Sequence, residues 1–589
     1  MTASQQNGSP SPFAERGLGG EVDGANQTNE PVGFVIGTED STPLSFWVGI
    51  SDDAYLQLDD VVVLHTNVPG RGDLKIYGLV QEVRSRHDGA SFDSDIFLVN
   101  EGRLPVGMSK AAKVVATRFE PEIFVPPEPG DQSYRARGRD RDEAMYFDQM
   151  QKGRVPAGLS RDGEPVYIDL EFLDGSRGAH VNISGISGFA TKTTYATFLL
   201  YSLFNSGVLK EHRANTRALF FNVKGEDLLY LDKKNRELFA DVEKQQDYIR
   251  LGLQPGGFSD SIGLWAPVQR QAAAQGSAVP DCERKDNVRA YYWTVREFVE
   301  EGYLRFLFAE ADDERSLLGD LVARIEHYLA RNSEPAQHPA CLKVEGEPIS
   351  SFEELVEFIR ARTEPDSHWM RGAGAAAGTA AAFVRRLEAA RLQVGHLIWG
   401  AAAEKPDEHR IDWQANQVSV IDIHNLSDRG KRFVTGVVIK RMFEDKERAG
   451  RRFPLSFLVL DELNKYAPRD GSSPIKDVLL DIAERGRSLG VILIGAQQTA
   501  SEVERRIIAN SAFRVVGRLD TAEAERAEYG YLPAVTRQRA AILKPGSMIL
   551  QQPHVPIPIQ LRFPFPSWAT RPEEAVIEET TADTIRSRL

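Results

Sequence analysis

The sequence is poor in cysteine and has no long apolar run. Its two cysteines, Cys282 and Cys341, exclude a disulfide framework and fit a reducing compartment. The longest apolar candidate, Phe198–Phe204, is far shorter than a segment that crosses a bilayer, so no membrane anchor is expected. The polar segment 1–30 lacks the apolar core of a signal peptide and is expected to be a flexible tail. We therefore expect a cytoplasmic protein without a membrane partner.

Negative charge exceeds positive charge, since 85 aspartates and glutamates against 71 lysines and arginines give a formal net charge of −14. Such an acidic chain does not coat DNA by bulk electrostatics, although a locally basic channel of a few lysines and arginines could still contact nucleic acid. The histidine, cysteine and carboxylate residues show no zinc-like spacing. The hydrophobic content of 42% and the length of 589 residues predict a globular protein of two or three domains.

The first predicted domain is a small antiparallel barrel over residues 31–125. Short β-prone runs separated by turn residues recur there at regular spacing, which is typical of a barrel or sandwich. These runs are Gly33–Gly37, Leu44–Val48, Asp60–His65, Leu74–Val83, Asp95–Val99 and Ala112–Thr117. A proline-rich piece and a charged stretch then predict a linker over residues 126–165.

The second predicted domain, residues 166–570, alternates strands with helices and so indicates a mostly parallel, doubly wound α/β sheet. The predicted strands are Val166–Leu170, His180–Ser184, Ala218–Val223, Val418–Asp422, Phe457–Leu460, Val491–Gly495 and Phe513–Gly517. Between about 228 and 405 the spacing is mainly helical, with one helix expected over Tyr291–Phe308, and predicts a helical insertion. Residues 571–589 are expected to form a C-terminal tail.

An acidic pair follows one of these strands. Four apolar residues, Phe457–Leu460, run directly into Asp461 and Glu462. The carboxyl ends of parallel strands are where open α/β sheets bind ligands. Two carboxylates there suit a nucleotide site, in which Asp461 holds Mg²⁺ and Glu462 polarises a water molecule.

A phosphate loop is predicted between the strand His180–Ser184 and a buried helix. The order strand, glycine-rich turn, Lys-Thr and helix is that of a loop whose backbone N–H groups and lysine bind phosphates, while the hydroxyl binds Mg²⁺. The predicted nucleotide-binding residues are Gly185, Ser187, Gly188, Ala190, Thr191, Lys192, Thr193 and Thr194. The strict G-x-x-x-x-G-K-[ST] spacing is not met, so the loop must be reshaped. A strand–turn–helix with a solvated lysine is the alternative.

Polar residues at other element ends could complete such a site. Gln497 and Gln498 follow a buried strand and could sense the γ-phosphate, or could be capping or surface residues. Arg485 and Arg487 end a helix and could reach a neighbouring subunit's γ-phosphate, or could simply favour a helix C-terminus. The turn Lys224–Asp227 could contact nucleotide or DNA, or be a surface turn.

Together these segments resemble the HerA-type ATPases, a branch of the FtsK-like, RecA-fold pumping ATPases. The resemblance spans about 32–568, and its N-terminal part looks like that family's HAS-barrel. The chain departs from the family at Ala190 and Thr191, where a glycine usually precedes the lysine. The segments that carry the likeness are His180–Gly188, Phe221–Glu226, Glu484–Gly490, Gly495–Gln498 and Pro545–Gly546.

The resemblance implies a homohexameric ring that uses ATP and Mg²⁺ to draw double-stranded DNA through its pore. It also implies a partner, either a NurA-like nuclease in DNA end processing or another effector in antiphage defence. Lys192 would bind the β and γ phosphates, and Gln498 or Gln497 would sense the γ-phosphate. Arg487, or as a second choice Arg485, would act from the adjacent subunit.

Two other readings remain open. The chain could be a nucleotide-stabilised hexameric scaffold that regulates a partner nuclease with little ATP turnover. It could also be a conjugation or packaging pump of the same superfamily, which would usually carry a membrane anchor. A motor requires Glu462, whereas a scaffold requires only the nucleotide binding to which Lys192 contributes.

Overall fold

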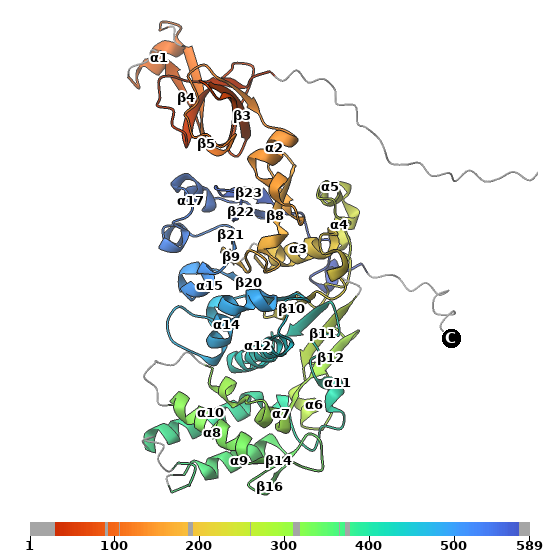
Figure 1. Cartoon of the computed structure of the whole chain (residues 1–589). Helices are drawn as coiled ribbons and strands as arrows, with labels where there is room; N and C mark the ends of the chain where they lie inside the picture. The colour runs from red at the N-terminus through yellow and green to blue at the C-terminus, as the bar shows by residue number, and fades with distance from the viewer. Residues whose placement is uncertain are drawn as a thin grey trace, which may run out of the picture. The chain divides into compact units, whose positions relative to one another are not determined.

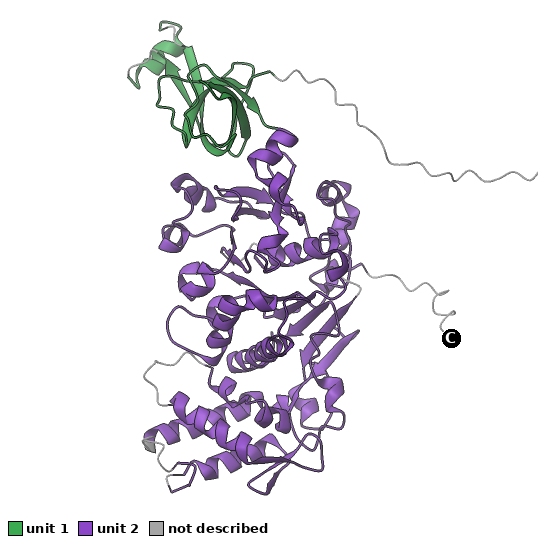
Figure 2. Ribbon diagram, in the orientation of Figure 1, with its two compact units in different colours: residues 1–136 green, residues 137–589 purple. Residues whose placement is uncertain are grey.

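The computed structural model describes residues 30–88, 92–104, 107–186, 192–258, 261–309, 318–364, 366–370 and 377–576. The chain divides into two compact units, Met1–Ala136 and Arg137–Leu589 (Figure 2). Among the described residues, no helix combines the length and the apolar character that crossing a membrane requires.

The first unit contains a closed barrel of six strands in the order β1-β2-β5-β4-β3-β6. The strands are β1 (Gly33–Val35), β2 (Ser45–Ile50), β3 (Val61–Val68), β4 (Gly72–Asp88), β5 (Gly107–Glu120) and β6 (Gln132–Arg135). β6 closes the ring by pairing antiparallel with both β1 and β3. The predicted barrel is confirmed, but its last strand lies within the segment predicted as a linker.

The strand predicted over Asp95–Val99 is wrong, because this segment forms the short helix α1 (Asp95–Asn100). The β4–β5 ladder ends at the pair Asp88 and Gly107, and α1 belongs to the connection between these two strands. α1 buries none of its residues, and Phe97 is 69% exposed. An apolar run without a neighbouring strand has no ladder to join.

The second unit is built on a twelve-stranded sheet (Figure 1). The order is β12-β11-β18-β10-β19-β20-β9-β21-β22-β23-β7-β8. Neighbours from β12 to β21 pair in parallel, and those from β21 to β8 pair antiparallel. The strands are β7 (Arg154–Leu159), β8 (Pro165–Asp169), β9 (Val181–Ser184), β10 (Arg217–Asn222), β11 (Ile262–Pro267), β12 (Val288–Tyr291), β18 (Val418–Asp422), β19 (Ser456–Leu460), β20 (Val491–Gln497), β21 (Phe513–Val516), β22 (Ser547–Gln551) and β23 (Ile559–Arg562). The predicted α/β class with a parallel-rich sheet is confirmed.

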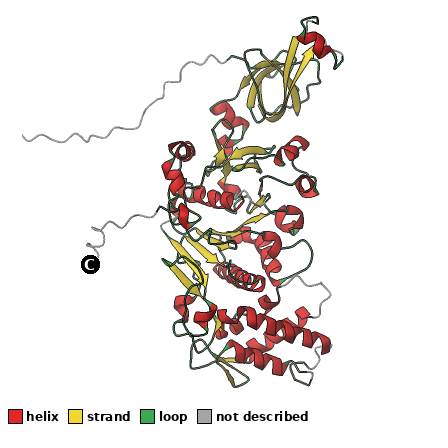
Figure 3. Ribbon diagram, turned by 180° about the vertical axis from the view of Figure 1, so that it is seen from behind, coloured by secondary structure: helices red, strands yellow, loops and turns green. Residues whose placement is uncertain are grey.

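Helices cover both faces of this sheet. Figures 1 and 3 show α3 on one side of the central strands and α12 and α14 on the other. Every residue of β19 and β20 is buried, as expected of parallel strands covered on both faces. The helices of the second unit outside the predicted insertion are α2 (Arg139–Ala144), α3 (Lys192–Asn205), α12 (Asp428–Ala449), α13 (Leu463–Tyr466), α14 (Pro474–Leu489), α15 (Arg505–Ala509), α16 (Thr521–Ala524) and α17 (Ala534–Ala540).

The segment predicted as a helical insertion, 228–405, also carries two strands of the central sheet, β11 and β12. Its helices are α4 (Arg236–Ala240), α5 (Val242–Arg250), α6 (Arg270–Ala273), α7 (Val295–Glu300), α8 (Leu318–Asn332), α9 (Phe352–Arg362) and α10 (Ala377–Val394), and α11 (Pro406–His409) follows. Two small sheets complete it, β13 (Trp293–Thr294) with β17 (Ile398–Trp399), and β14 (Ser333–Pro335), β15 (Leu342–Val344) and β16 (Glu347–Ile349).

The helix predicted over Tyr291–Phe308 is also wrong at its start. The chain is extended up to Thr294, whose side chain caps α7 in a capping box with Glu297. Such a box satisfies two free N–H groups at a helix start, and it therefore fixes the helix boundary four residues later than apolar spacing suggests. Apolar spacing alone does not separate a buried strand from a buried helix.

His180 fixes the entry to β9. Its backbone has φ +66°, and its Nδ1 accepts a hydrogen bond from the Leu493 N–H of β20 at 2.9 Å. The side chain is only 2% exposed, and burial lowers its pKa to about 4. The imidazole is therefore neutral in the folded protein at neutral pH, as an acceptor must be.

We expect acid to destabilise the protein through this histidine. The unfolded chain takes up the proton near pH 6.5 and the folded chain only near pH 4, so the free energy of unfolding falls as pH drops through that window. The loss from one such group is on the order of 3 kcal/mol. In His180→Asn, the amide oxygen can accept the same N–H and asparagine tolerates positive φ. Urea unfolding at pH 7 and pH 4.5 should show weaker acid sensitivity in this variant, and equal sensitivity would contradict the assignment.

Candidate functional site

The acidic strand and the Lys-Thr helix meet at the carboxyl edge of the sheet. Asp461 follows β19, and Thr193 is the second residue of α3. The Thr193 Oγ1 donates to Asp461 Oδ2 at 3.1 Å across 268 positions of sequence. Asp461 is only 6% exposed, so this contact is part of the folded interior. The juxtaposition predicted from the sequence is present.

Lys192 lies beside this pair. Its Nζ donates to the Gly185 carbonyl at 2.7 Å, which ties the start of α3 to the end of β9. Burial lowers the pKa of Lys192, and the charge of Asp461 partly offsets that effect. Four other predicted loop residues, Ser187, Gly188, Ala190 and Thr191, lie outside the described residues.

Glu462 has an unusual backbone conformation for its residue type. Its φ of +55° is left-handed, and its N–H donates to Asp461 Oδ1 at 2.8 Å. Left-handed non-glycine residues are costly and cluster at functional sites. Burial alone would raise the pKa of Glu462, but contacts with Lys465 at 2.7 Å and Lys224 at 3.4 Å outweigh it and lower that pKa. The carboxylate is therefore ionised and able to accept a hydrogen bond from water.

Lys224 joins the acidic pair from a third strand. It is the second residue after β10, which pairs in parallel with β19, so both strand ends reach the same edge. Its Nζ lies 3.1 Å from Asp461 Oδ2. Burial would lower the pKa of Lys224, but the two carboxylates raise it above its ordinary value. Lys224 is therefore part of the candidate site, and the contact of this turn with nucleotide or DNA stays a prediction.

A cavity of about 380 Å³ opens beside these groups. It is lined by Lys192, Thr193, Thr194, Lys224, Asp461 and, on another side, by Trp568, Thr570, Arg571 and Glu574. The C-terminal residues were expected to be a tail from 571. Instead, Glu574 accepts bonds from the N–H and hydroxyl of Thr570, both at 2.9 Å, and Ala575 bridges to Asn235. Nothing in the sequence pattern signals this packing.

The donor set fits a hydrated Mg²⁺. Adjacent ligands of an octahedral Mg²⁺, each about 2.1 Å from the metal, are about 3 Å apart. The Thr193 hydroxyl and the Asp461 carboxylate oxygen are 3.1 Å apart, so both could bind one ion. Both are the hard oxygen ligands that Mg²⁺ prefers. Among the described residues, no cluster of three histidine, cysteine or carboxylate side chains forms a dedicated metal cage.

The two glutamines differ in position. Gln497 ends β20 fully buried, and its Nε2 donates to Asn182 Oδ1 at 2.9 Å. Its side chain is therefore buried against β9, and it is not among the residues that line the cavity beside Lys192. Gln498 is exposed immediately beyond the strand. Of the pair, only Gln498 has a side chain at the surface of this edge.

The two arginines lie near the end of α14. Arg487 is exposed and donates to the carbonyls of Gly175 at 3.2 Å and Ser176 at 2.8 Å. Arg485 pairs with Glu447 of α12. Neither is among the residues that line the cavity beside Lys192, and their role in a neighbouring subunit stays a prediction.

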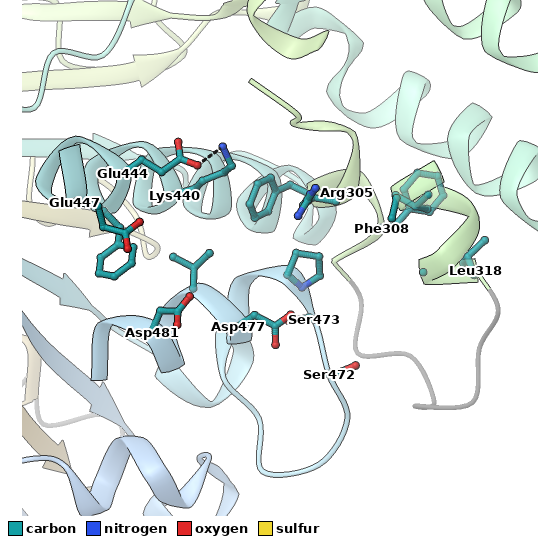
Figure 4. Close-up of a pocket in the computed structure, with 17 residues that line it drawn as sticks. Arg305, Phe308, Leu318, Lys440, Glu444, Glu447, Ser472, Ser473, Asp477 and Asp481 are labelled. Carbon is teal, nitrogen blue, oxygen red and sulfur yellow. Dashed lines mark ion pairs between the residues drawn. The ribbon is translucent and has the colours of Figure 1, made fainter. Parts of the chain in front are cut away.

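A second cavity, of about 480 Å³, lies among α12, α14 and the segment around Phe306 (Figure 4). Figure 4 shows Glu444, Glu447, Asp477 and Asp481 at its edges. It contains none of the predicted site residues. Its charged lining residues are these four carboxylates and the two cations Arg305 and Lys440, so negative charge predominates and disfavours a phosphate ligand.

No family model matches the chain, and no curated protein matches it. Solved structures similar to it include VirB4 of Thermoanaerobacter pseudethanolicus, at 17% identity over 71% of this chain and 97% of that one, with a TM-score of 0.40. Another is the plasmid coupling protein TrwB in complex with ADP and Mg²⁺, at 12% identity over 73% and 95%, with a TM-score of 0.44. A third is the genome packaging NTPase B204 from Sulfolobus turreted icosahedral virus 2, at 10% identity over 26% and 70%, with a TM-score of 0.20.

At such identities and scores the fold assignment rests on this chain's own sheet. The chain is a mixed α/β protein with a parallel-rich sheet and a closed six-stranded barrel. Its candidate site consists of a buried lysine and a threonine at the start of α3 and two carboxylates at the carboxyl end of β19.

Proposed function

We propose that the chain is an ATPase that binds ATP with Mg²⁺ in the cavity beside Lys192. The observation that carries this proposal is the 3.1 Å contact between Thr193 and Asp461, with Lys192 and Glu462 adjacent. A hydroxyl, a carboxylate, an ammonium and a second carboxylate at one helix N-terminus are the groups that phosphoryl transfer to water requires.

Each side chain then has a role. Lys192 and the first N–H groups of α3 bind the β and γ phosphates, and Thr193 with Asp461 would hold Mg²⁺, which supplies charge neutralisation during transfer. Ionised Glu462 orients the attacking water and accepts its proton. Gln498 is the sensor residue of this proposal. Thr194 lines the cavity and adds to phosphate binding.

We further propose a HerA-type homohexamer that moves double-stranded DNA and acts with a nuclease or another effector. The motif resemblance over 32–568 supports this reading, as does a closed barrel at the position of the HAS-barrel. The cytoplasmic location expected from two cysteines belongs to the same proposal. With a net charge of −14, DNA contacts would be confined to a few cations of each subunit.

A nucleotide-stabilised scaffold is the second candidate. Thr191 stands where a strict phosphate loop has glycine, and a reshaped loop favours binding with slow turnover. In that case the ring and its partner's activity depend on bound nucleotide rather than on hydrolysis.

The test is phosphate release with and without duplex DNA, together with the mass of the protein in solution. We expect DNA-stimulated release from a hexamer, and ATP affinity about 10- to 100-fold lower in Lys192→Ala because a charge-assisted phosphate contact is lost. Lys210→Ala, on the exposed surface beyond α3, is the matched control and should bind ATP normally. A monomer that ignores DNA would contradict the motor, and a wild-type protein that takes up no ATP would contradict both candidates.

A further inference from the structure

One oxygen of the candidate site already contacts a cation. Asp461 Oδ2 accepts a hydrogen bond from the Thr193 hydroxyl and is also 3.1 Å from Lys224 Nζ. The same ammonium lies 3.4 Å from Glu462 Oε1. It thus contacts both carboxylates, and on Asp461 it contacts the oxygen that the proposed function assigns to the metal.

The ammonium reduces a repulsion built into the site. Asp461 and Glu462 are adjacent in sequence and both are mostly buried, so their charges oppose each other in a medium of low dielectric constant. Among the residues that the structure describes, Lys224 contacts both, whereas Lys465 contacts Glu462 at its other oxygen, Oε2, at 2.7 Å. A lysine at this position neutralises part of the carboxylate charge that a bound metal ion would neutralise.

The lysine side chain can leave without moving its loop. It is 47% exposed. The backbone around it is held, because Asn222 Nδ2 donates to the Gly225 carbonyl at 2.7 Å and the Arg284 N–H donates to Glu226 Oε2 at 3.2 Å. Rotation about side-chain bonds therefore suffices to withdraw the ammonium from Asp461.

We propose that Lys224 is a tethered counter-ion that occupies the cation position of the nucleotide-free site and is displaced from Asp461 when metal and nucleotide bind. The inference rests on the proposed function. Because Lys224 competes for the same oxygen, Mg²⁺ alone binds weakly. A triphosphate adds enough negative charge for the metal and the lysine to be accommodated together. The site therefore takes up metal with nucleotide rather than metal first.

The test is a magnesium titration of the nucleotide-free, full-length protein, followed by the shift in its melting temperature. We expect wild-type protein to respond weakly and Lys224→Met, which keeps the length but removes the charge, to respond at about three- to tenfold lower Mg²⁺ concentration. Without Mg²⁺, Lys224→Met should also melt below wild type, because the two carboxylates are no longer neutralised. Lys465→Met, which removes an equal charge without vacating the Asp461 oxygen, should titrate like wild type.

The inference would be overturned if wild type and Lys224→Met responded at the same Mg²⁺ concentration. It would also be overturned if Lys465→Met responded at the same lowered Mg²⁺ concentration as Lys224→Met. Lys224→Arg retains the charge, so it should restore the weak wild-type response even if methionine perturbs folding. ATP binding by the wild-type protein is measured in parallel. Its absence contradicts the proposed nucleotide site, whereas normal binding with identical titrations contradicts only the counter-ion role.

Discussion

Glu462→Gln is expected to lower ATP hydrolysis about 10²- to 10⁴-fold, the usual contribution of a positioned general base. Glutamine has the same shape but cannot accept the proton of the attacking water. Lys192, Thr193 and Asp461 remain, so binding of ATP with Mg²⁺ should stay within a few-fold of wild type. Steady-state phosphate release and binding of a slowly hydrolysed ATP analogue separate the two effects.

The control for this variant is Glu353→Gln in the first turn of α9, an exposed carboxylate outside the candidate site. It should hydrolyse ATP at the wild-type rate. If Glu462→Gln hydrolyses ATP at the wild-type rate, Glu462 is not the general base. If hydrolysis is lost but a partner's activity is retained, while Lys192→Ala abolishes that activity, the scaffold replaces the motor.

The parts of the fold that could be predicted are the strands whose residues are apolar throughout. β19 and β20 are buried throughout because helices cover both faces of the parallel sheet. Such continuous, mainly apolar runs can be recognised from the sequence alone. β6 is different. It is a short strand whose pairing partners, β1 and β3, lie far away in the sequence, so no local pattern separates it from a linker. The strand predicted at α1 was wrong for the opposite reason, because this apolar run has no neighbouring strand with which to pair.

Some residues of the candidate site could likewise be predicted from the sequence, and others could not. The proximity of Asp461 and Thr193 could be predicted from the sequence, because the carboxyl ends of parallel strands lie at one edge of the sheet. Lys224 could only be placed once β10 was known to pair directly with β19. The contribution of Glu574 and its neighbours depends on chain return after β23, for which the sequence carries no signal. Gln497 is buried because β20 continues two residues beyond the predicted strand end at Gly495.

Arg487→Ala is expected to reduce hydrolysis by on the order of a thousandfold or more, if its guanidinium neutralises transition-state charge in the neighbouring subunit. ATP binding should change little, since Arg487 does not line the cavity of its own chain. Arg485→Ala, which removes a comparable surface arginine paired to Glu447, serves as the comparison. A larger loss in Arg485→Ala than in Arg487→Ala would exchange their roles.

Mixing variants tests whether the arginine acts between subunits. An Arg487→Ala subunit retains Glu462, and a Glu462→Gln neighbour can supply Arg487, so an equal mixture of two inactive proteins should regain activity at about one quarter of its sites. The recovery should require subunit exchange and grow with mixing time. If Arg487 instead serves its own chain, where it donates to Gly175 and Ser176, every site in the mixture lacks one group and activity stays at the level of the separate variants.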